Sequence, residues 1–370
     1  YAKRFSSTNK ITLFLKNETS GIRLKYKIDI AINTLVPTHQ ERQTLHISLW
    51  LIYGINSNLA HEVREAATPV HFRLLRSIGN LSDGVKQICD MRANLLYIEL
   101  CRIHVLALMK TENDKSVASL LHRLEESARE LLLVWFCQSN VKLERLTWQS
   151  PGDILYKVAN HEAVHPVKGP SDLMKRLGNL RRCYYFSHET MPREPLVIVY
   201  VALLNDIADN VQHLDSPEDD CTTAIYYSIT ATQPGLSGID LGNMLIKSVA
   251  RLLHSELPSI RTHSTLSPIP GFRTWMLRNL HGSSFYNYFV VQFNFYSEVQ
   301  ASCSLIEMLK YVFLRSCGHY LCSRRQNGFA LNSVANFHLK NGAEIYRLNW
   351  MGDTSDRGLN NSIGIMVNYR

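Results

Sequence analysis

The stretch that decides the fold is residues 224–247, which read AIYYSITATQPGLSGIDLGNMLIK. Residues 224–229 are β-branched and aromatic like a buried strand, whereas residues 241–253 carry apolar side chains at helical spacing. Three glycines fall at this junction: Gly235, Gly238 and Gly242. Glycine removes the side chain where a backbone turns sharply or approaches a ligand, and the free N–H groups of a new helix point toward an anion. The junction therefore predicts a phosphate-binding loop.

The spacing of these glycines matches neither common nucleotide signature. It lacks the Gly-x-Gly-x-x-Gly of dinucleotide-binding folds and the Gly-Lys-Ser/Thr of the P-loop. It fits better the acyl-CoA diphosphate loop of the acetyltransferase-like fold, in which consecutive N–H groups and the positive end of a helix bind the diphosphate. Lys247 and Arg251, one turn apart on that helix, either reach the phosphates or carry solvated surface charge.

Size and charge limit the possible functions. The chain has 370 residues, 45% of them hydrophobic, which is enough for two domains with real cores. Its formal charge of +8 favours a polyanionic partner, whether DNA, an acidic membrane surface or a phosphorylated ligand. We find no nucleic-acid recognition motif, and the apolar stretch at residues 45–55 has about half the length needed to cross a bilayer. We therefore expect no nucleic-acid partner and no membrane insertion, and a CoA ester fits the charge.

Two stretches carry metal-ligating residue types. Residues 161–165, HEAVH, match the zinc-peptidase pattern in which two imidazoles one helical turn apart bind the metal. Pro166 disfavours helical geometry at His165, so we interpret this stretch as a helix end whose histidines cap it or face solvent. Cys317 and Cys322 lack a second pair of ligands and are interpreted as two buried thiols on one helix. We predict no metal site, and the unpaired spacing of all eight cysteines indicates a reduced, intracellular protein.

Hydrophobic periodicity divides the chain into a helical part and a mixed part. Apolar residues recur at three- and four-residue intervals over residues 63–136, with a break at 80–84 and an amphipathic helix at 117–136. The later part mixes expected strands at 196–203, 224–229, 343–350 and 363–369 with expected helices at 241–253 and 305–313. We predict an α+β multidomain protein: an uncertain leader at 1–62 with strand-like alternation, a helical domain at 63–144 and an α/β domain at 145–370.

A hydroxyl and an imidazole lie further along the chain. Ser267 precedes Pro268, which favours extended backbone, and Pro270-Gly271 then turns the chain, so the hydroxyl lies on a stiff segment. Taken alone, Ser267 is interpreted as a turn residue and His338 as a satisfied core or surface histidine.

Several long blocks of sequence give these two residues a context. They are residues 181–188 (RRCYYFSH), 194–197 (EPLV), 227–247, 264–272 (STLSPIPGF) and 334–342 (VANFHLKNG). In this order, over residues 63–370, they resemble the malonyl-CoA decarboxylase family. The resemblance implies an N-terminal all-α helical bundle that builds a homo-oligomer, a tetramer in the family, and then an acetyltransferase-like (GNAT-type) α/β catalytic domain. It implies no metal at residues 162–166.

The resemblance also implies the site. Ser267 and His338 are the expected catalytic pair, with His338 as proton donor and Ser267 as hydrogen-bonding partner of His338 or of the substrate. The expected malonyl-CoA-binding residues are Ser237, Gly238, Ile239, Asp240, Leu241, Gly242 and Asn243. The expected reaction converts malonyl-CoA to acetyl-CoA and carbon dioxide, and so sets the malonyl-CoA level for fatty-acid synthesis and oxidation. No cofactor is expected, because a carboxylate β to a thioester leaves as carbon dioxide and yields an enolate without an electron sink.

The resemblance further implies a C-terminal segment beyond Asn368-Tyr369-Arg370 and permits an inter-subunit disulfide at Cys183. The mitochondrial matrix is the expected compartment, with the cytoplasm or peroxisome as alternatives, and the sequence KRFSS at residues 3–7 has the character of a transit peptide. Two other functions stay open. An acyl-CoA N-acyltransferase would use the same loop with an amine acceptor, and a non-catalytic paralogue would bind CoA or form oligomers without turnover.

Overall fold

The computed structural model describes residues 68–105, 112–215, 221–280, 303–325 and 328–370. The chain forms two compact units, residues 1–73 and 74–370, and the second holds both sheets and the cavity described below. The strand-like alternation predicted within residues 1–62 lies outside the described residues. No helix among the described residues is both long enough and apolar enough to cross a bilayer.

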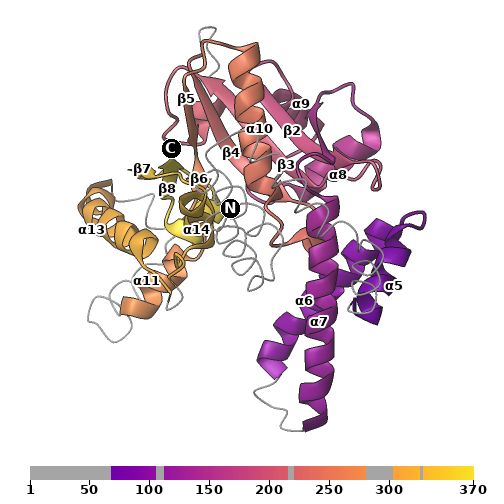
Figure 1. Ribbon diagram of the computed structural model, residues 1–370. Coiled ribbons are helices and arrows are strands. Elements are labelled where there is room, and N and C mark those ends of the chain that lie inside the picture. The colour runs from indigo at the N-terminus through magenta and orange to yellow at the C-terminus, as the bar shows by residue number, and fades with distance from the viewer. Residues whose placement is uncertain (1–67, 106–111, 216–220, 281–302, 326–327) are drawn as a thin grey trace, which may run out of the picture. The chain divides into compact units, whose positions relative to one another are not determined.

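The helical region consists of α5 (Val70–Gly79), α6 (Gly84–Val105) and α7 (Glu112–Trp135), and α6 and α7 run side by side (Figure 1). The predicted break at residues 80–84 and the predicted long helix before Phe136 are both confirmed. α7 contains no glycine or proline, and its leucines recur at helical spacing, so that Leu131 and Leu132 are buried. Arg92 of α6 and Glu125 of α7 form an ion pair inside this helical region.

A five-stranded sheet follows, in the order β1-β2-β3-β4-β5. Its strands are β1 (Val141–Leu146), β2 (Arg181–His188), β3 (Val197–Leu204), β4 (Thr223–Ala231) and β5 (Thr262–Thr265). The first three pairings are antiparallel and only β4 and β5 are parallel, connected by the crossover helix α10 (Leu241–Glu256). Every residue of β3 is buried, as its unbroken apolar sequence predicts for a central strand covered on both faces.

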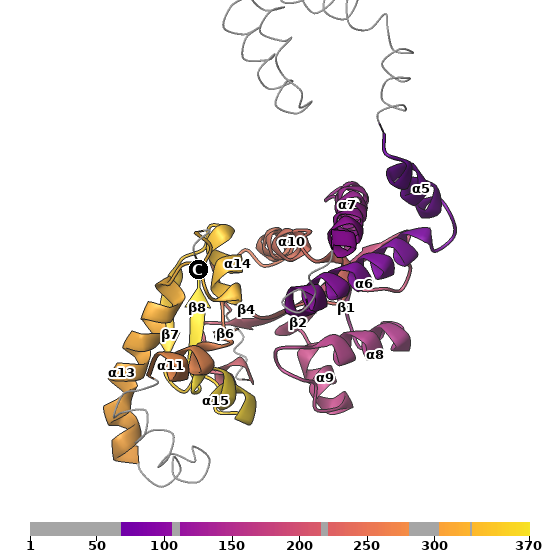
Figure 2. The ribbon, with the colours of Figure 1, turned by 90° about the horizontal axis from the view of Figure 1, so that it is seen from below.

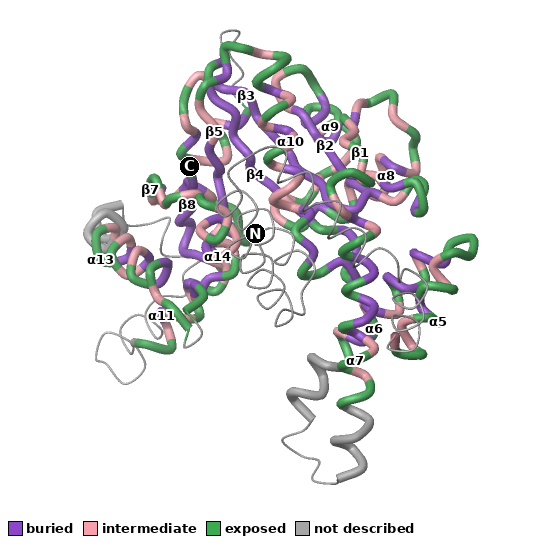
Figure 3. Tube along the Cα trace, viewed as in Figure 1, coloured by how far each residue is buried: buried purple, intermediate pink, exposed green. Residues whose placement is uncertain are grey.

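Helices cover both faces of this sheet. α10 lies on one face, and α8 (Gly152–His161) and α9 (Pro170–Arg176) lie on the other (Figure 2). The core beneath α8 and α9 combines their apolar residues with the tyrosines and aliphatic residues of β2, β3 and β4. Figure 3 shows that the buried residues concentrate along the strands. The sheet therefore gives a rigid base for the loop that leaves the end of β4.

A second, three-stranded sheet lies beside β5, in the order β6-β8-β7, with both pairings antiparallel. It consists of β6 (Ser267–Pro268), β7 (Ile345–Asn349) and β8 (Met366–Tyr369). Three helices pack with it around a separate core: α11 (Phe272–Leu280), α13 (Cys303–Cys322) and α14 (Ser333–Lys340). A fourth helix, α15 (Asp356–Ser362), contacts α11 and β6. Two 3-10 turns, η1 (Gln212–Asp215) and η2 (Pro234–Leu236), complete the described elements.

The predicted fold class is confirmed. A helical region precedes a mixed α/β domain in which antiparallel strands are followed by one parallel pair across a helix, the arrangement expected of an acetyltransferase-like domain. Two local predictions are wrong. Ile363 ends α15 in the left-handed conformation, with φ 57°, so the last strand begins only at Met366. Cys322 is exposed at the end of α13, and only Cys317 is buried. Cys183, where the resemblance permits a disulfide, is fully buried in β2.

Candidate active site

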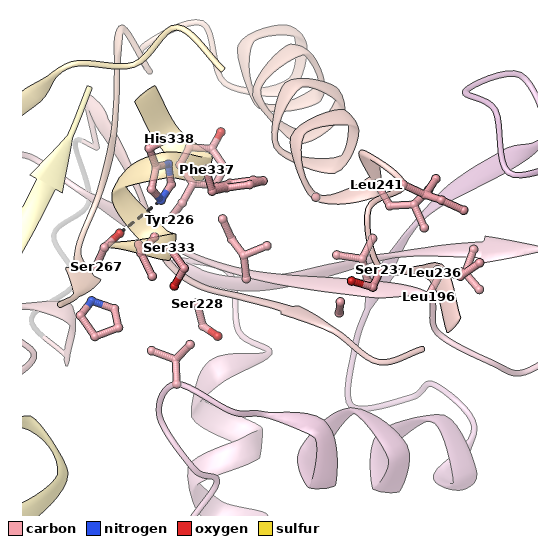
Figure 4. Close-up of a pocket in the computed structure, with 18 of the residues that line it drawn as sticks. Leu196, Tyr226, Ser228, Leu236, Ser237, Leu241, Ser267, Ser333, Phe337 and His338 are labelled. Carbon is pink, nitrogen blue, oxygen red and sulfur yellow. Dashed lines mark hydrogen bonds between the residues drawn. The ribbon is translucent and has the colours of Figure 1, made fainter. Parts of the chain in front are cut away.

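A cavity of about 370 Å³ lies where the two sheets meet. Its walls come from β3 and β4, the glycine-containing loop, the start of α10, β6 and α14. Figure 4 shows Ser267 and His338 at one end of the cavity, and Leu236, Ser237 and Leu241 at the other. The cavity therefore brings together Ser267, His338 and most of the predicted binding segment, which come from three separate parts of the sequence.

The glycine-containing loop has the predicted form, a strand followed by a turn and a helix, but its three glycines serve different purposes. A Cβ on Gly235 would lie 1.9 Å from the backbone oxygen of Cys89, so this glycine is required by the close approach of α6. A Cβ on Gly242 would lie 3.3 Å from the ring of Phe337 on α14. Only Gly238 combines a left-handed conformation, φ 77°, with room for a Cβ, whose nearest neighbour would be Arg129 Nε at 3.8 Å. Of the three glycines, Gly238 is thus the one whose geometry suits the predicted close approach to a ligand.

α6 supports this loop through Arg92. The Arg92 guanidinium donates to the carbonyl oxygens of Gly235 and Ser237 at 2.5 and 2.8 Å, and its Nε donates to Glu125 at 2.9 Å. The Arg92 side chain is 3% exposed, so the bonds form away from water and hold the loop firmly. Sequence reasoning missed Arg92, because nothing in the local pattern of α6 indicates which loop it contacts.

Ser267 is held at the start of β6. Its Oγ donates to Thr265 Oγ1 at 2.9 Å, and Thr265 Oγ1 also accepts the backbone N–H of Tyr369 at 3.1 Å. Ser267 Oγ lies 3.5 Å from His338 Nε2, a long hydrogen bond. Because the Ser267 proton is directed to Thr265, its lone pairs face the imidazole or a ligand.

His338 lies in the last turn of α14. Asn332 caps this helix by accepting the Ala335 N–H at 2.9 Å, and its side chain also donates to the Pro270 carbonyl at 2.9 Å, which ties α14 to the segment after Ser267. The imidazole stacks on the Tyr369 ring, with centroids 4.4 Å apart. Burial lowers the pKa of His338 to about 4, so the imidazole is neutral at neutral pH in the free protein.

This pKa predicts an acid-dependent loss of stability. Above pH 6.5 both folded and unfolded imidazoles are neutral; as the pH falls toward 4, the unfolded chain takes up a proton that folded His338 does not. We expect His338 to cost the folded state roughly 3 kcal/mol by pH 4. Urea unfolding of the parent and of a His338→Leu variant between pH 7 and pH 4 measures this: the parent should lose stability more steeply. Parallel slopes would show that the site does not suppress protonation.

A second buried polar pair begins at the cavity lining, which includes Ser228. Ser228 of β4 donates from Oγ to both carboxylate oxygens of Glu162 at 2.8 Å, and the Glu162 carboxylate also accepts the N–H groups of Val164 and His165 at 2.8 Å. Glu162 is 6% exposed, so these donors satisfy a buried charge. Sequence reasoning did not find this pair, since its members are far apart in the chain and the spacing that contains Glu162, HEAVH, points to metal binding and not to Ser228.

The HEAVH stretch has the geometry of a helix end, as predicted. α8 ends at His161, whose exposed ring nitrogen Nδ1 lies 2.7 Å from the Lys157 carbonyl, and Glu162 is already extended. His165 lies beyond the helix and is partly buried near Tyr227, where burial lowers its pKa to about 4, so the prediction that both histidines cap the helix or face solvent is wrong for His165. The two imidazoles do not share a helix face, and no group of three potential metal ligands occurs among the described residues.

The structure brings most of the predicted binding segment to the cavity. The residues of this segment that line the cavity are Ser237, Gly238, Ile239, Leu241 and Gly242. Asp240 and Asn243 lie outside the lining, where the Asn243 side chain donates to the Asp240 carboxylate at 2.9 Å at the start of α10. Arg251 bonds to the Lys247 carbonyl and the Ser248 hydroxyl of its own helix, which places its guanidinium along the surface of α10.

Comparisons with known proteins show which family the chain belongs to. Residues 140–370 match the family model "Malonyl-CoA decarboxylase C-terminal domain", and residues 52–136 match "Malonyl-CoA decarboxylase N-terminal domain". The chain is 38% identical over 341 residues to "Malonyl-CoA decarboxylase, mitochondrial" of Anser anser anser, covering 83% of this chain and 65% of that protein. The corresponding mouse protein is 37% identical over 339 residues, covering 83% of this chain and 66% of that protein. The chain thus spans about two thirds of the length of these relatives.

Two solved structures extend the comparison. The malonyl-CoA decarboxylase of Rhodopseudomonas palustris is 28% identical with a TM-score of 0.69, covering 98% of this chain and 92% of that one. The malonyl-CoA decarboxylase of Agrobacterium vitis is 27% identical with a TM-score of 0.71, covering 98% of this chain and 83% of that one. Fold and cavity define a protein with a helical region and an acetyltransferase-like domain. The chain belongs to the malonyl-CoA decarboxylase family.

Proposed function

We propose that this chain catalyses the decarboxylation of malonyl-CoA to acetyl-CoA and carbon dioxide. The observation that carries the proposal is the cavity with the Ser267 and His338 side chains at one end and the glycine-containing loop at the other (Figure 4). A CoA thioester has its reactive acyl group at one end and its phosphates at the other. The end with Ser267 and His338 suits the acyl group, and the end with the glycine-containing loop suits the phosphates.

The substrate needs little from the protein beyond orientation and a proton. Loss of carbon dioxide from the malonyl group leaves an enolate delocalised onto the thioester oxygen, and a proton then converts the enolate to the methyl group of acetyl-CoA. The protein aligns the breaking C–C bond with the carbonyl π system, stabilises the enolate oxygen and delivers the proton. No electron-sink cofactor takes part in this proposal.

We assign the proton transfer to His338 and hydrogen bonding of the acyl group or of His338 to Ser267. Free His338 is neutral because burial lowers its pKa to about 4. A malonyl carboxylate bound beside it places a negative charge in a site of low polarity, which raises the pKa of His338 and favours uptake of the proton that is later donated. Because Ser267 Oγ donates to Thr265, it can accept from His338 Nε2–H and orient the ring.

The proposal is tested by incubating the purified protein with malonyl-CoA alone in deuterium oxide. We expect acetyl-CoA and carbon dioxide in equal amounts, with one solvent deuteron in the new methyl group. A Ser267→Ala variant should turn over more slowly at similar CoA affinity, because it loses only one hydroxyl of the pair. Acyl transfer that requires an added amine would instead identify an N-acyltransferase, and tight CoA binding without turnover would identify a non-catalytic paralogue.

The remaining properties of the family extend the proposal. We propose a helical oligomerisation domain over residues 63–144 that forms a homo-oligomer, a tetramer, and a catalytic domain over residues 145–370. The curated relatives named above are mitochondrial by name. We accordingly propose the mitochondrial matrix as the compartment of this chain, with the cytoplasm or peroxisome as the alternatives.

A further inference from the structure

α7 of the helical region brings a cation to the end of the cavity opposite His338. A Cβ placed on Gly238 would lie 3.8 Å from Nε of Arg129. Both residues are exposed, and Gly238 also lines the cavity. The Arg129 guanidinium is therefore next to the one glycine of the loop at which a Cβ would meet no close contact, and this glycine lines the cavity.

Two neighbouring acids of α7 are engaged elsewhere, and the third, exposed Glu130, directly follows Arg129 and therefore points to a different side of the helix. Glu125, one turn before Arg129, pairs with Arg92, and Glu126 pairs with His122 at 3.7 Å. No ion pair involves Arg129 within the described ranges of the chain. An arginine beside a loop, without a carboxylate of its own, keeps its donors available for a ligand.

The loop itself offers further donors at this end. Arg92 engages the carbonyl oxygens of Gly235 and Ser237, so these acceptors are already satisfied. The N–H groups of Gly238, Gly242 and Asn243 have no hydrogen-bond acceptor within the described residues. The negative charge of the Asp240 carboxylate repels an anion, but this carboxylate accepts a hydrogen bond from the Asn243 side chain. Donors therefore predominate around Gly238.

We infer that Arg129 is a ligand-binding residue that donates to a phosphate oxygen of the CoA ester, so that the helical region contributes directly to the site. This inference rests on the proposed function, which supplies a phosphate-bearing ligand. Bidentate pairing with phosphate is characteristic of arginine, and a single such contact typically changes affinity about tenfold or more. The diphosphate and the 3′-phosphate of CoA share this chemistry.

The experiment measures CoA binding by calorimetry for the parent, Arg129→Gln, Arg129→Lys and the matched control Arg123→Gln. Arg123 lies on the same helix, is exposed, and bonds to the Ser119 carbonyl of its own helix at 3.4 Å. We expect Arg129→Gln to bind CoA about tenfold more weakly, with Arg129→Lys in between and Arg123→Gln equal to the parent. The gap between the parent and Arg129→Gln should narrow as the salt concentration rises.

Dephospho-CoA, which lacks the 3′-phosphate, distinguishes binding of the diphosphate from binding of the 3′-phosphate. If the Arg129→Gln effect persists with dephospho-CoA, Arg129 binds the diphosphate; if it vanishes, Arg129 binds the 3′-phosphate. Equal CoA affinity of Arg129→Gln and Arg123→Gln would overturn the inference, as would a gap that salt leaves unchanged. A parent that binds CoA but leaves malonyl-CoA intact would contradict the proposed reaction alone. A parent that binds no CoA would overturn both.

Discussion

Replacing His338 by Gln is expected to lower the turnover of malonyl-CoA by about 100-fold or more, the usual scale for a positioned proton donor. Glutamine keeps a polar side chain of similar reach but cannot act as a general acid near neutral pH. The dissociation constant for CoA should change little, because the loop that lines the other end of the cavity is untouched. Single-turnover kinetics and calorimetry on the same preparation separate the two effects.

The matched control for this variant is His319→Gln. His319 is an exposed histidine on α13 that contacts Trp275 and does not line the cavity. Its replacement should leave turnover at the parental value. A double variant, His338→Gln with Ser267→Ala, should lose less than the product of the two single losses, because both residues act in one step. Parental turnover by His338→Gln would show that the proton comes from another group.

Replacing Arg92 by Leu is expected to destabilise the protein by roughly 3–5 kcal/mol, the typical cost of breaking a buried ion pair from one side. The change leaves the Glu125 carboxylate buried without its cation and leaves the carbonyl oxygens of Gly235 and Ser237 without their donor. The loop should also lose its fixed shape. Urea unfolding reports the first effect, and CoA affinity reports the second.

Two further variants test the cause. Changing Glu125 to Leu together with Arg92→Leu removes the unpaired charge, so part of the lost stability should return while CoA affinity stays low. Lys86→Leu removes the cation of an exposed pair with Asp90 on the same helix and should change stability by about 0.5 kcal/mol or less. If Arg92→Leu were as mild as Lys86→Leu, the buried pair would not hold the helical region to the loop.

Sequence reasoning succeeded where the signal is local. The junction between β4 and α10 was predictable because a β-branched run, a glycine-containing turn and an amphipathic helix follow one another within a single stretch. That the helix would not include His165 was predictable because Pro166 follows directly, although α8 already ends at His161. Ser267 and His338 needed the family resemblance, since a serine before a proline and a lone histidine carry no specific signal.

It failed where the cause lies far along the chain. The two-residue strand β6 exists only because Ser267 and Pro268 pair with β8, about a hundred residues later. The need for Gly235 comes from the backbone of Cys89 in α6, and the burial of Glu162 depends on Ser228. Such contacts depend on how separate elements pack, and no periodicity in one segment contains that information.

The different neighbours of Gly235 and Gly242 have a consequence for how sequences of this family can diverge. At Gly242 the neighbouring group is the Phe337 ring. A second substitution that shortens the Phe337 side chain can therefore make room for an alanine at this glycine. The obstacle at Gly235 is a main-chain oxygen, which every amino acid carries at that position. No single exchange elsewhere restores the space. Gly235 should therefore be replaced only in relatives in which the backbone of α6 has moved away from the loop. A glycine at this position thus indicates that α6 contacts the loop.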